Sequence, residues 1–439
     1  MREPFVALIG RPNTGKSTLF NKISGKRISI VEDTPGVTRD RIITDTSWSG
    51  NSFFLIDTGG IEPKSDDIIL KQMKRQANLA IDMADVIVLV VDGRAGVTAS
   101  DREVATMIRK SGKPCVLAVN KIDSFDIDYL RYEFYDLALG EPIGISAEHA
   151  LGFGDLLDEV VKHFPENKKG IEEEERTKIA VVGKPNAGKS SLVNTLLGEN
   201  RVIVSNISGT TRDAIDTIFN YEGKNYTLID TAGIRRKAKI YDDIEHYSTI
   251  RAIGAIERAD ICLLMIDAME GVTDQDVKIA GLIKDRYKAV IIVINKWDLV
   301  EKETNTMKDM EKKVRSSLYF LDFAPILFIS ATEKKRTHKL MPLIEEVLTE
   351  YGKRITTGLL NEIMGDAVMM NNPPSKGTRR MKIFYSSQVS TAPPTFVIFV
   401  NEPELEQDAY SRYLTNKIRE AFTFLGSPIK LIYRKKQEN

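Results

Sequence analysis

The sequence predicts an α/β protein made of two tandem copies of a mainly parallel sheet with flanking helices, followed by a small α+β domain. Three observations predict this fold class: an internal repeat, short β-branched runs that alternate with longer amphipathic segments, and a change of pattern near Gly352. The chain has 439 residues, enough for several domains. We expect a first domain over 1–165, an acidic linker over 166–175, a second domain over 176–351 and a C-terminal domain over 352–439.

The repeat is clearest in a glycine-rich segment that occurs twice, at Gly10–Asn21 and Gly183–Asn194, with eight of twelve positions identical. Two later motifs, Gly36-Val-Thr-Arg-Asp and Asp57-Thr-Gly-Gly, have counterparts at the same offset of 173 residues, whereas the last two motifs recur at 175 and 184. The β-branched runs of the first copy are Phe5–Ile9, Phe53–Ile56, Val86–Val91 and Val116–Val119. Because amphipathic segments separate these runs, we expect strands joined by helical crossovers, and therefore a mainly parallel sheet in each copy.

The linker and the tail follow other patterns. Glu172–Glu175 lies in a polar stretch without apolar periodicity, which is typical of a solvated tether, with an acidic docking strip as the alternative. In the tail, apolar positions between Ile355 and Met370 share one helical face. Its other expected elements are strands at Met381–Tyr385, Thr395–Val400 and Ile429–Tyr433 and a helix at Ala409–Phe424. From Gly352 onward the tail has thirteen basic and eight acidic residues, a net charge of +5.

Composition excludes several classes of protein. With 42% apolar and 28% charged residues, the chain is not collagen-like, disordered or a disulfide scaffold. Basic and acidic residues number 62 each, so affinity for nucleic acid or anionic membranes must come from a local patch. Cys115 and Cys262 begin apolar runs and are expected to be buried strand thiols, and no zinc-ligand spacing is present. No apolar stretch approaches the ~20 residues of a membrane span, and the N-terminus does not resemble a secretory signal. We expect a cytoplasmic protein that does not associate with membranes.

The repeated glycine-rich segment has the pattern G-x-x-x-x-G-K-S between an expected strand and an expected helix. Its glycines allow backbone N–H groups to surround a phosphate at a helix N-terminus. Lys16 and Lys189 are expected to reach the terminal phosphates, and Ser17 and Ser190 to ligate Mg²⁺. A glycine-rich turn with a surface lysine is the alternative, but two copies in register argue against it. The nucleotide-binding candidates in this loop are Gly10, Arg11, Pro12, Asn13, Thr14, Gly15, Lys16 and Ser17, with Gly183, Lys184, Pro185, Asn186, Ala187, Gly188, Lys189 and Ser190 in the second copy.

A second pair of motifs predicts a switch that senses the γ-phosphate. Asp57 and Asp230 follow apolar runs, so their carboxylates are expected at the strand ends where open α/β sheets bind ligands, holding Mg²⁺ through its water shell. Thr38 and Thr211 are expected to add a second hydroxyl ligand in the triphosphate state. Gly60 and Gly233 are expected to donate an N–H to the γ-phosphate, whose loss would release the segment that follows. The remaining candidates of these motifs are Thr58, Gly59 and Ile61, with Thr231, Ala232 and Ile234. The catalytic candidates are Lys16, Thr38 and Gly60, with Lys189, Thr211 and Gly233.

A third pair of motifs predicts the choice of base. Asn120-Lys-Ile-Asp123 and Asn295-Lys-Trp-Asp298 each follow an apolar run. A fixed carboxylate accepts hydrogen bonds from N1–H and the 2-amino group of guanine, whereas adenine lacks both donors, so GTP is expected to be preferred. The stems of the two lysines are expected to lie along the base, and backbone N–H groups of a Ser-Ala pair to close the pocket. The candidates are Asn120, Lys121, Ile122, Asp123, Ser146 and Ala147, with Asn295, Lys296, Trp297, Asp298, Ser330 and Ala331.

In this order the motifs resemble the Ras-like translation-factor class of P-loop GTPases. Two such domains followed by a small C-terminal domain are similar to the bacterial Der (EngA) family of tandem-domain ribosome-assembly GTPases. The resemblance covers essentially the whole chain. It implies hydrolysis of GTP to GDP, a KH-like C-terminal domain in contact with the GTPase domains, GTP-dependent association with the rRNA and proteins of the large ribosomal subunit, and a role in ribosome biogenesis. We expect a monomer. The alternative is a GTPase that acts on a protein or membrane partner through its C-terminal domain.

Ile61 and Ile234 depart from the Ras pattern, which has a water-orienting glutamine at this position. Hydrolysis is therefore expected to be slow without a helper that supplies positive charge and positions water. Asn13 and Asn186 match the position at which related GTPases bind K⁺, so potassium-stimulated hydrolysis is a hypothesis; stabilisation of the loop turn is the alternative. Arg39 and Arg212 are either arginine fingers acting within the chain or solvated, phosphate-positioning residues.

Two basic regions lie outside these motifs. Arg235-Arg-Lys237 either contacts RNA or the C-terminal domain or forms a charged loop face. The tail has no Gly-x-x-Gly pair, the loop with which KH domains clamp RNA, so conventional RNA binding by that loop is not expected. The basic residues available to meet phosphates or to pack on the GTPase domains are Lys376, Arg379, Arg380, Lys382 and Arg434-Lys-Lys436.

Overall fold

The structure is a computed structural model of the chain, which divides into two compact units, Met1–Glu172 and Glu173–Asn439. We describe each unit by itself. The expected linker, 166–175, lies outside the described residues. The structure describes residues 3–24, 43–57, 78, 80–81, 83–165, 176–198, 202–204, 216–229, 245–301 and 303–436.

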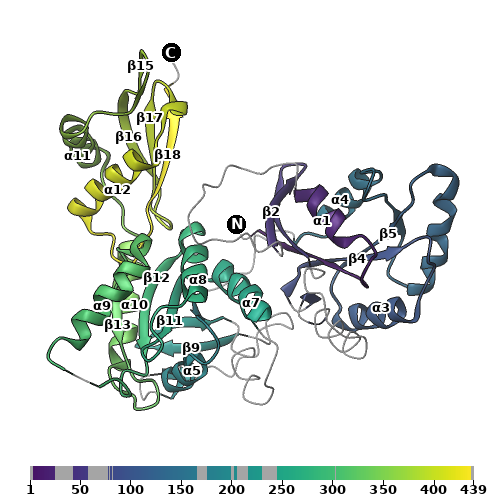
Figure 1. The fold of residues 1–439 in the computed structure, drawn as a ribbon, viewed down its shortest axis with the longest axis horizontal. Helices are drawn as coiled ribbons and strands as arrows, with labels where there is room; N and C mark the ends of the chain where they lie inside the picture. Colours follow the sequence, from purple (N-terminus) through teal and green to yellow (C-terminus); the bar gives the residue numbers. More distant parts are fainter. Residues whose placement is uncertain are drawn as a thin grey trace. The chain divides into compact units, whose positions relative to one another are not determined.

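The first unit contains a six-stranded sheet in the order β2-β3-β1-β4-β5-β6 (Figure 1). Its pairs are parallel except for the antiparallel hairpin of β2 and β3 at one edge, which confirms the predicted mainly parallel sheet. The strands are β1 (Phe5–Ile9), β2 (Ile43–Trp48), β3 (Asn51–Asp57), β4 (Val86–Asp92), β5 (Cys115–Asn120) and β6 (Pro142–Gly144). The helices are α1 (Lys16–Ser24), α3 (Ala99–Ser111), the 3₁₀ helix η1 (Phe125–Leu137) and α4 (Phe153–Lys162).

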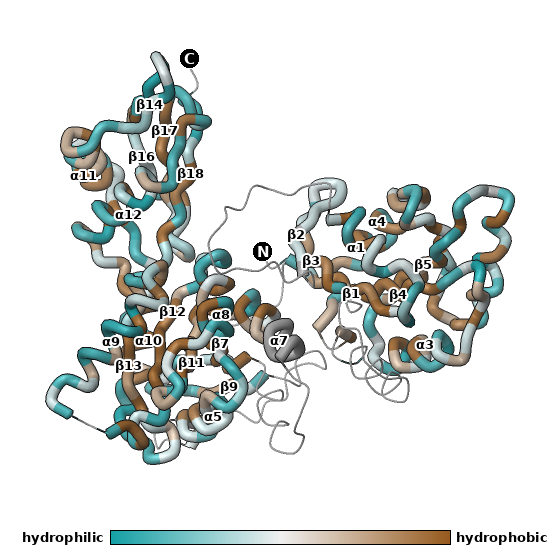
Figure 2. The backbone as a smooth tube through the Cα atoms, viewed as in Figure 1, coloured by the Kyte–Doolittle hydropathy of each residue, from teal (hydrophilic) through white to brown (hydrophobic). Residues whose placement is uncertain are grey.

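Burial explains why these segments form a sheet covered by helices. Every residue of β1 and β4 is buried, as expected for central parallel strands that have helices on both faces. On one face, α1 contributes Leu19 and Phe20 and α4 contributes Leu156 and Val160 to a single apolar core with the strands. The hydropathy colouring shows the same arrangement, with apolar strands in the interior (Figure 2).

The second unit begins with a seven-stranded sheet in the order β13-β12-β11-β7-β10-β9-β8. Its centre repeats the first copy, since β7 pairs in parallel with β10 and β11 as β1 does with β3 and β4. The strands are β7 (Thr177–Val182), β8 (Val202–Val204), β9 (Thr217–Tyr221), β10 (Lys224–Leu228), β11 (Ile261–Asp267), β12 (Ala289–Asn295) and β13 (Ile326–Phe328). The helices are α5 (Lys189–Leu197), α7 (Glu245–Arg258), α8 (Asp274–Asp285), α9 (Thr306–Ser317), η3 (Tyr319–Leu321), η4 (Thr337–Lys339) and α10 (Leu340–Tyr351).

The tail forms the small α+β domain that its pattern predicts. Its three-stranded sheet has the order β16-β17-β18, antiparallel and then parallel, and shares one core with α11 and α12 (Figure 1). The short hairpin of β14 and β15 was not expected from the sequence. The elements are α11 (Thr357–Met370), β14 (Ser375–Lys376), β15 (Arg379–Arg380), β16 (Ile383–Ser390), β17 (Thr395–Val400), η5 (Pro403–Leu405), α12 (Asp408–Phe422) and β18 (Lys430–Lys435).

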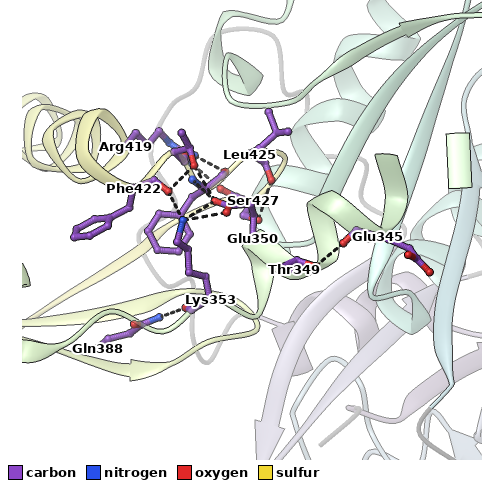
Figure 3. A network of polar contacts seen from close by, with 11 residues as sticks. Glu345, Thr349, Glu350, Lys353, Gln388, Arg419, Phe422, Leu425 and Ser427 are labelled. Atoms are coloured by element: carbon purple, nitrogen blue, oxygen red, sulfur yellow. Dashed lines mark hydrogen bonds and ion pairs between the residues drawn. The ribbon is translucent and has the colours of Figure 1, made fainter. Parts of the chain in front are cut away.

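A polar network joins the C-terminal domain to the end of α10 (Figure 3). The Glu350 carboxylate accepts hydrogen bonds from Lys353 Nζ at 3.0 Å, Thr423 Oγ1 at 2.9 Å and Phe424 N at 2.9 Å. Lys353 Nζ also donates to Phe422 O at 3.0 Å. Residues on both sides of the junction therefore share one network.

Backbone and aromatic contacts strengthen the same junction. Gly426 accepts a hydrogen bond from Val290 N of β12 and donates one to Phe323 O, both at 2.8 Å. The Arg419 guanidinium lies 4.3 Å from the Phe323 ring centroid and donates to Ser427 O at 2.7 Å. Burial lowers the pKa of Arg419 to about 10, with Asp322 opposing the shift. The C-terminal domain thus contacts the second parallel-sheet domain directly.

Candidate functional site

The glycine-rich loop of the first unit connects β1 to α1 and passes very close to residues of strands β4 and β5. Gly10 has φ +157°, and a Cβ there would lie 2.2 Å from the carbonyl oxygen of Val90. Gly15 has φ +90°, and a Cβ there would lie 2.1 Å from Asn120 Nδ2. Asn13 is also left-handed, with φ +65°. No side chain fits at Gly10 or Gly15, so the backbone of the glycine-rich loop itself lines the site.

Lys16 lies inside this loop. Its Nζ donates a hydrogen bond to Arg11 O at 2.7 Å, and the residue is only 5% exposed. Burial lowers the pKa of Lys16 to about 8, although the nearby Asp57 carboxylate raises it. A poorly solvated ammonium group beside backbone N–H groups suits an anionic ligand.

Two predicted metal ligands of the first unit lie together. Ser17 Oγ, in the first turn of α1, donates to Asp57 Oδ2 at 2.9 Å, and Asp57 is the last residue of β3. A hydroxyl and a carboxylate are the oxygen ligands that Mg²⁺ prefers. These two residues therefore fit a magnesium site at the carboxyl edge of the sheet.

The base motif connects directly to the glycine-rich loop. Asn120 Nδ2 donates to Thr14 O at 2.7 Å, and Asn120 Oδ1 accepts from Ala147 N at 2.8 Å. We expected the N–H groups of Ser146 and Ala147 to close the base pocket, but in this structure they donate to Leu151 O and to Asn120. Asn120 thus fastens three loops together, and its 3% exposure makes it part of the core of the site.

The carboxylate expected to recognise guanine is held from two sides. Asp123 Oδ1 accepts from Ser146 Oγ at 2.6 Å and Oδ2 accepts from Arg94 Nη2 at 2.6 Å. Arg94 was not predicted, because only the fold brings it close to Asp123. Lys121, with φ +70°, donates to Asp92 Oδ2 at 2.6 Å. Burial raises the pKa of Asp92, but hydrogen bonds from Lys121 and from backbone N–H groups outweigh it and leave the pKa below its usual range.

The second copy repeats this geometry. Lys189 Nζ donates to Gly183 O at 2.7 Å and to Lys184 O at 2.5 Å. Asn295 Nδ2 donates to Ala187 O at 2.9 Å, and its Oδ1 accepts from Ala331 N at 3.0 Å. A Cβ on Gly188 would lie 2.0 Å from Asn295 Nδ2, as at the matching glycine of the first copy.

The base end of the second copy repeats the contacts of the first and has a cavity beside it. Lys296 Nζ donates to Asp267 Oδ2 at 2.6 Å, as in the first copy. Ser330 N donates to Lys335 O and not toward the base. A cavity of about 320 Å³ opens beside this motif, lined in part by Trp297, Asp298 and Ser330.

Comparison with known proteins identifies the family. A model described as "50S ribosome-binding GTPase" matches residues 5–121 and 178–296, and one described as "KH-domain-like of EngA bacterial GTPase enzymes, C-terminal" matches 354–434. A protein named GTPase Der from Alkaliphilus metalliredigens is 57% identical over 436 residues, 99% of each chain. Another from Ruminiclostridium cellulolyticum is 58% identical over 439 residues, 100% of each chain. The chain belongs to the GTPase Der family.

As a member of the Der family, the chain has two GTPase domains and a KH-like C-terminal domain, and it is a GTP-binding and GTP-hydrolysing switch. The two glycine-rich loops and the two base motifs lie inside the regions matched by the GTPase model, except for the last two residues of each base motif. Within the part of the chain that the structure describes, no helix is long and apolar enough to cross a membrane.

Several candidates of the Der site lie outside the described residues. These include the switch threonines, the glycines expected at the γ-phosphate and the second magnesium-binding aspartate. They are Thr38, Thr58, Gly59, Gly60, Ile61, Thr211, Asp230, Thr231, Ala232, Gly233 and Ile234. Arg39, Arg212 and Arg235-Arg-Lys237 also lie outside. Among the residues described, His, Cys, Asp and Glu side chains form no cluster of three or more suited to a metal ion.

Proposed function

We propose that each GTPase domain of this chain binds GTP with Mg²⁺ at its glycine-rich loop, and that the nucleotide state controls association with the large ribosomal subunit during ribosome biogenesis. The observation that carries the nucleotide part is the bridge made by Asn120 and by Asn295, whose amides link the phosphate loop to the base motif. The family model's description as a 50S ribosome-binding GTPase supports the ribosomal part. The cytoplasm is the compartment that fits this function, and the acting species is a monomer.

At the phosphate end, the ammonium group of the lysine in each loop gives up its hydrogen bond to a backbone carbonyl and donates to phosphate oxygens. Lys16 Nζ already lies 2.7 Å from Arg11 O, so only a local displacement separates it from an incoming anion. Ser17 and Asp57, whose side chains share a hydrogen bond, would hold Mg²⁺, with Thr38 as the additional hydroxyl. Ser190, Asp230 and Thr211 take the same roles in the second domain. Gly60 and Gly233 donate to the γ-phosphate, and the isoleucines beside them leave intrinsic hydrolysis slow.

At the base end, Asp123 and Asp298 select guanine through N1–H and the 2-amino group. Replacing the carboxylate by an amide removes one acceptor and adds a donor, which suits the 2-carbonyl of xanthine. We expect Asp123→Asn or Asp298→Asn to weaken GTP binding in the altered domain by about 100-fold and to improve binding of xanthosine triphosphate. Titration of each variant with both fluorescent nucleotides tests this. Unchanged GTP affinity would exclude the assignment.

The glycine-rich loop of each domain also offers a place for a monovalent cation. Asn13 and Asn186 share a left-handed backbone, with φ +65° and +64°, a conformation that asparagine tolerates better than most residues. We propose that their side-chain oxygens hold K⁺ against the phosphates. The GTPase rate should then rise when K⁺ replaces Na⁺ at constant ionic strength, and Asn13→Gly should abolish this rise in the first domain. If glycine keeps both the rate and the K⁺ response, the asparagine serves the turn alone.

Cosedimentation tests the ribosomal part and separates it from the alternative of a protein or membrane partner. The full chain is pelleted with large ribosomal subunits and a non-hydrolysable GTP analogue over a salt series. Nucleotide-dependent pelleting that weakens with salt supports the proposal, because phosphate contacts release counterions. Comparing Lys16→Ala with Lys189→Ala identifies the domain that controls binding. Pelleting that ignores the nucleotide would favour another partner.

A further inference from the structure

The helix that follows the base motif of the first domain presents an exposed row of three tyrosines. This helix, η1, is a 3₁₀ helix of 13 residues, whereas such helices rarely exceed about four. Because a 3₁₀ helix has three residues per turn, Tyr129, Tyr132 and Tyr135 line up along one edge. They are 63%, 53% and 50% exposed. The rings of Tyr132 and Tyr135 are nearly parallel, with centroids 6.4 Å apart.

The other edges of η1 hold this tyrosine row in place. Phe134 and Leu137 are buried in the first domain. Arg109 of α3 donates to Leu137 O at 2.6 Å, and Val97 N donates to Glu133 Oε1 at 3.0 Å. Hydrogen bonds hold both ends of the turn that carries Tyr135 to neighbouring segments. The tyrosine row is therefore a pre-organised surface.

The surroundings of the tyrosine row are acidic. Residues 124–141 contain five acidic residues and one basic residue, a net charge of −4. The single basic residue is Arg131, whose guanidinium lies 5.1 Å from the Tyr132 ring centroid and pairs with Asp128 at 3.1 Å. This contact shows that a guanidinium can rest on a ring of the tyrosine row while a neighbouring carboxylate neutralises it.

The corresponding segment of the second domain lacks these features. Its helix α9, Thr306–Ser317, contains four basic and two acidic residues and no aromatic residue. Both segments follow the base motif of a GTPase domain, so the fold and the nucleotide chemistry do not require the tyrosine row. The row is a property of the first domain alone, which points to a partner of that domain.

We propose that the tyrosine row of η1 docks an arginine- and lysine-rich segment of a partner protein. Tyrosine faces attract cations, and the acidic residues around them attract the same charge from a distance. RNA fits less well, because its bases would stack on the rings while its phosphates would face carboxylates. The surface lies outside the nucleotide contacts described above, so this proposal stands or fails independently of the GTPase assignment.

Fluorescence anisotropy of the full chain tests the proposal with a labelled peptide of alternating arginine and glycine as the probe. Changing all three tyrosines to alanine should weaken binding by about tenfold or more, because each ring contributes a cation–π contact. Changing all three to phenylalanine should leave the affinity within about twofold, because the ring faces remain. In the double variant Asp126→Asn, Glu141→Gln, the affinity for the peptide should depend less steeply on salt concentration than in the parent chain, because long-range attraction is lost.

Matched controls make each outcome decisive. Tyr319→Ala removes a tyrosine that is 58% exposed on η3 of the second domain, and it should not change peptide binding. In chains that carry Lys189→Ala, fluorescent GTP binding should be equal in all variants, which shows that the first domain remains folded. Equal peptide affinity of the triple alanine variant and the parent would overturn the proposal. So would ring-dependent binding of a single-stranded oligouridylate in place of the peptide, because that result would identify a nucleic-acid surface.

Discussion

At the scale of single residues, two glycines set the distance between the phosphate loop and the base motif. Gly15 and Gly188 have φ +90° and +93°, and the nearest atom to a Cβ at either position belongs to the amide of Asn120 or Asn295. That amide also fastens the loop that follows β5 or β12 to the Ser-Ala pair. A methyl group at these positions therefore displaces the residue that connects both ends of the nucleotide site.

Gly15→Ala should abolish measurable GTP binding by the first domain and leave the second domain unaffected. The substituted residue meets Asn120 Nδ2 at 2.1 Å and also carries the strain of a left-handed backbone. Gly50→Ala is the matched control, because Gly50 has φ +82° with no atom within 4 Å of a Cβ. It should cost about 1 kcal/mol of stability and no affinity. Titration with a fluorescent GTP analogue, in chains that carry Lys189→Ala, measures the affinity of both variants. Normal binding by Gly15→Ala would contradict the steric argument.

Whether a residue of this site could be predicted depends on how local its pattern in the sequence is. Lys16, Ser17 and Asn120 were predicted because each belongs to a short motif whose chemistry depends on neighbours in the sequence. Arg94 could not be predicted, because its contact with Asp123 spans 29 residues and exists only once β4 and β5 pair. The hydrogen bond from Ala147 N to Asn120 was missed for the same reason.

At the scale of elements, the helices α3 and α8 begin with the same reciprocal capping box. Thr98 accepts a hydrogen bond from Asp101 N, and Asp101 accepts one from Thr98 N. Thr273 and Asp276 repeat this pair in the second domain. Because the two boxes start corresponding helices, they offer a test of the same local interaction in two copies of one fold.

Thr98→Ala should lower the free energy of unfolding of the first domain by about 1 kcal/mol, because the Thr98 hydroxyl accepts from Asp101 N and donates to Asp101 Oδ2, and both hydrogen bonds are lost. Thr98→Ser keeps the acceptor and should cost little. The chain has two tryptophans, Trp48 and Trp297, so in a Trp297→Phe background urea unfolding followed by Trp48 fluorescence reports the first unit. Thr273→Ala, followed through Trp297 with Trp48→Phe, should give a similar loss. If Thr98→Ala destabilised the second unit, or Thr273→Ala the first, the effect of the cap would not be local.

Element patterns predicted the central strands better than the irregular elements. The mostly apolar strands β4 and β17 appear where runs of β-branched and apolar residues predict them. The 3₁₀ helix η1 was not anticipated, because a repeat of three residues is easily taken for the 3.6-residue repeat of an α-helix over a short segment. The hairpin of β14 and β15 has only two residues in each strand, too few for an alternating pattern.

At the scale of the whole molecule, the junction between the second GTPase domain and the KH-like domain is made by contacts with no signature in the sequence. Val290 N and Gly426 O are 136 residues apart in the chain, yet a hydrogen bond joins them at the start of β12. At the end of α10, the Glu350 carboxylate accepts hydrogen bonds from three donors. The resemblance to the Der family implied that such contacts exist, but only the structure identifies the residues.

Glu350→Gln should therefore destabilise the second unit by about 1–3 kcal/mol at pH 7, because a carboxylate with three donors is replaced by a weaker acceptor. Burial raises the pKa of Glu350, but the hydrogen bonds from Lys353, Thr423 and Phe424 N and the charge of Lys353 outweigh it, so the pKa lies below the usual 4.5. A lowered pKa means that this stabilisation is present above pH 4.5 and disappears as the pH falls through the folded-state value.

The difference in unfolding free energy between the parent chain and Glu350→Gln should thus narrow in acid, since glutamine does not titrate. Urea unfolding followed by Trp297 fluorescence in a Trp48→Phe background, at a series of pH values, measures it. Glu346→Gln, at an exposed position one turn earlier on α10, should change stability by less than about 0.5 kcal/mol. A deficit in Glu350→Gln that stays constant from neutral pH into acid would mean that packing, and not the carboxylate charge, holds the KH-like domain to the second GTPase domain.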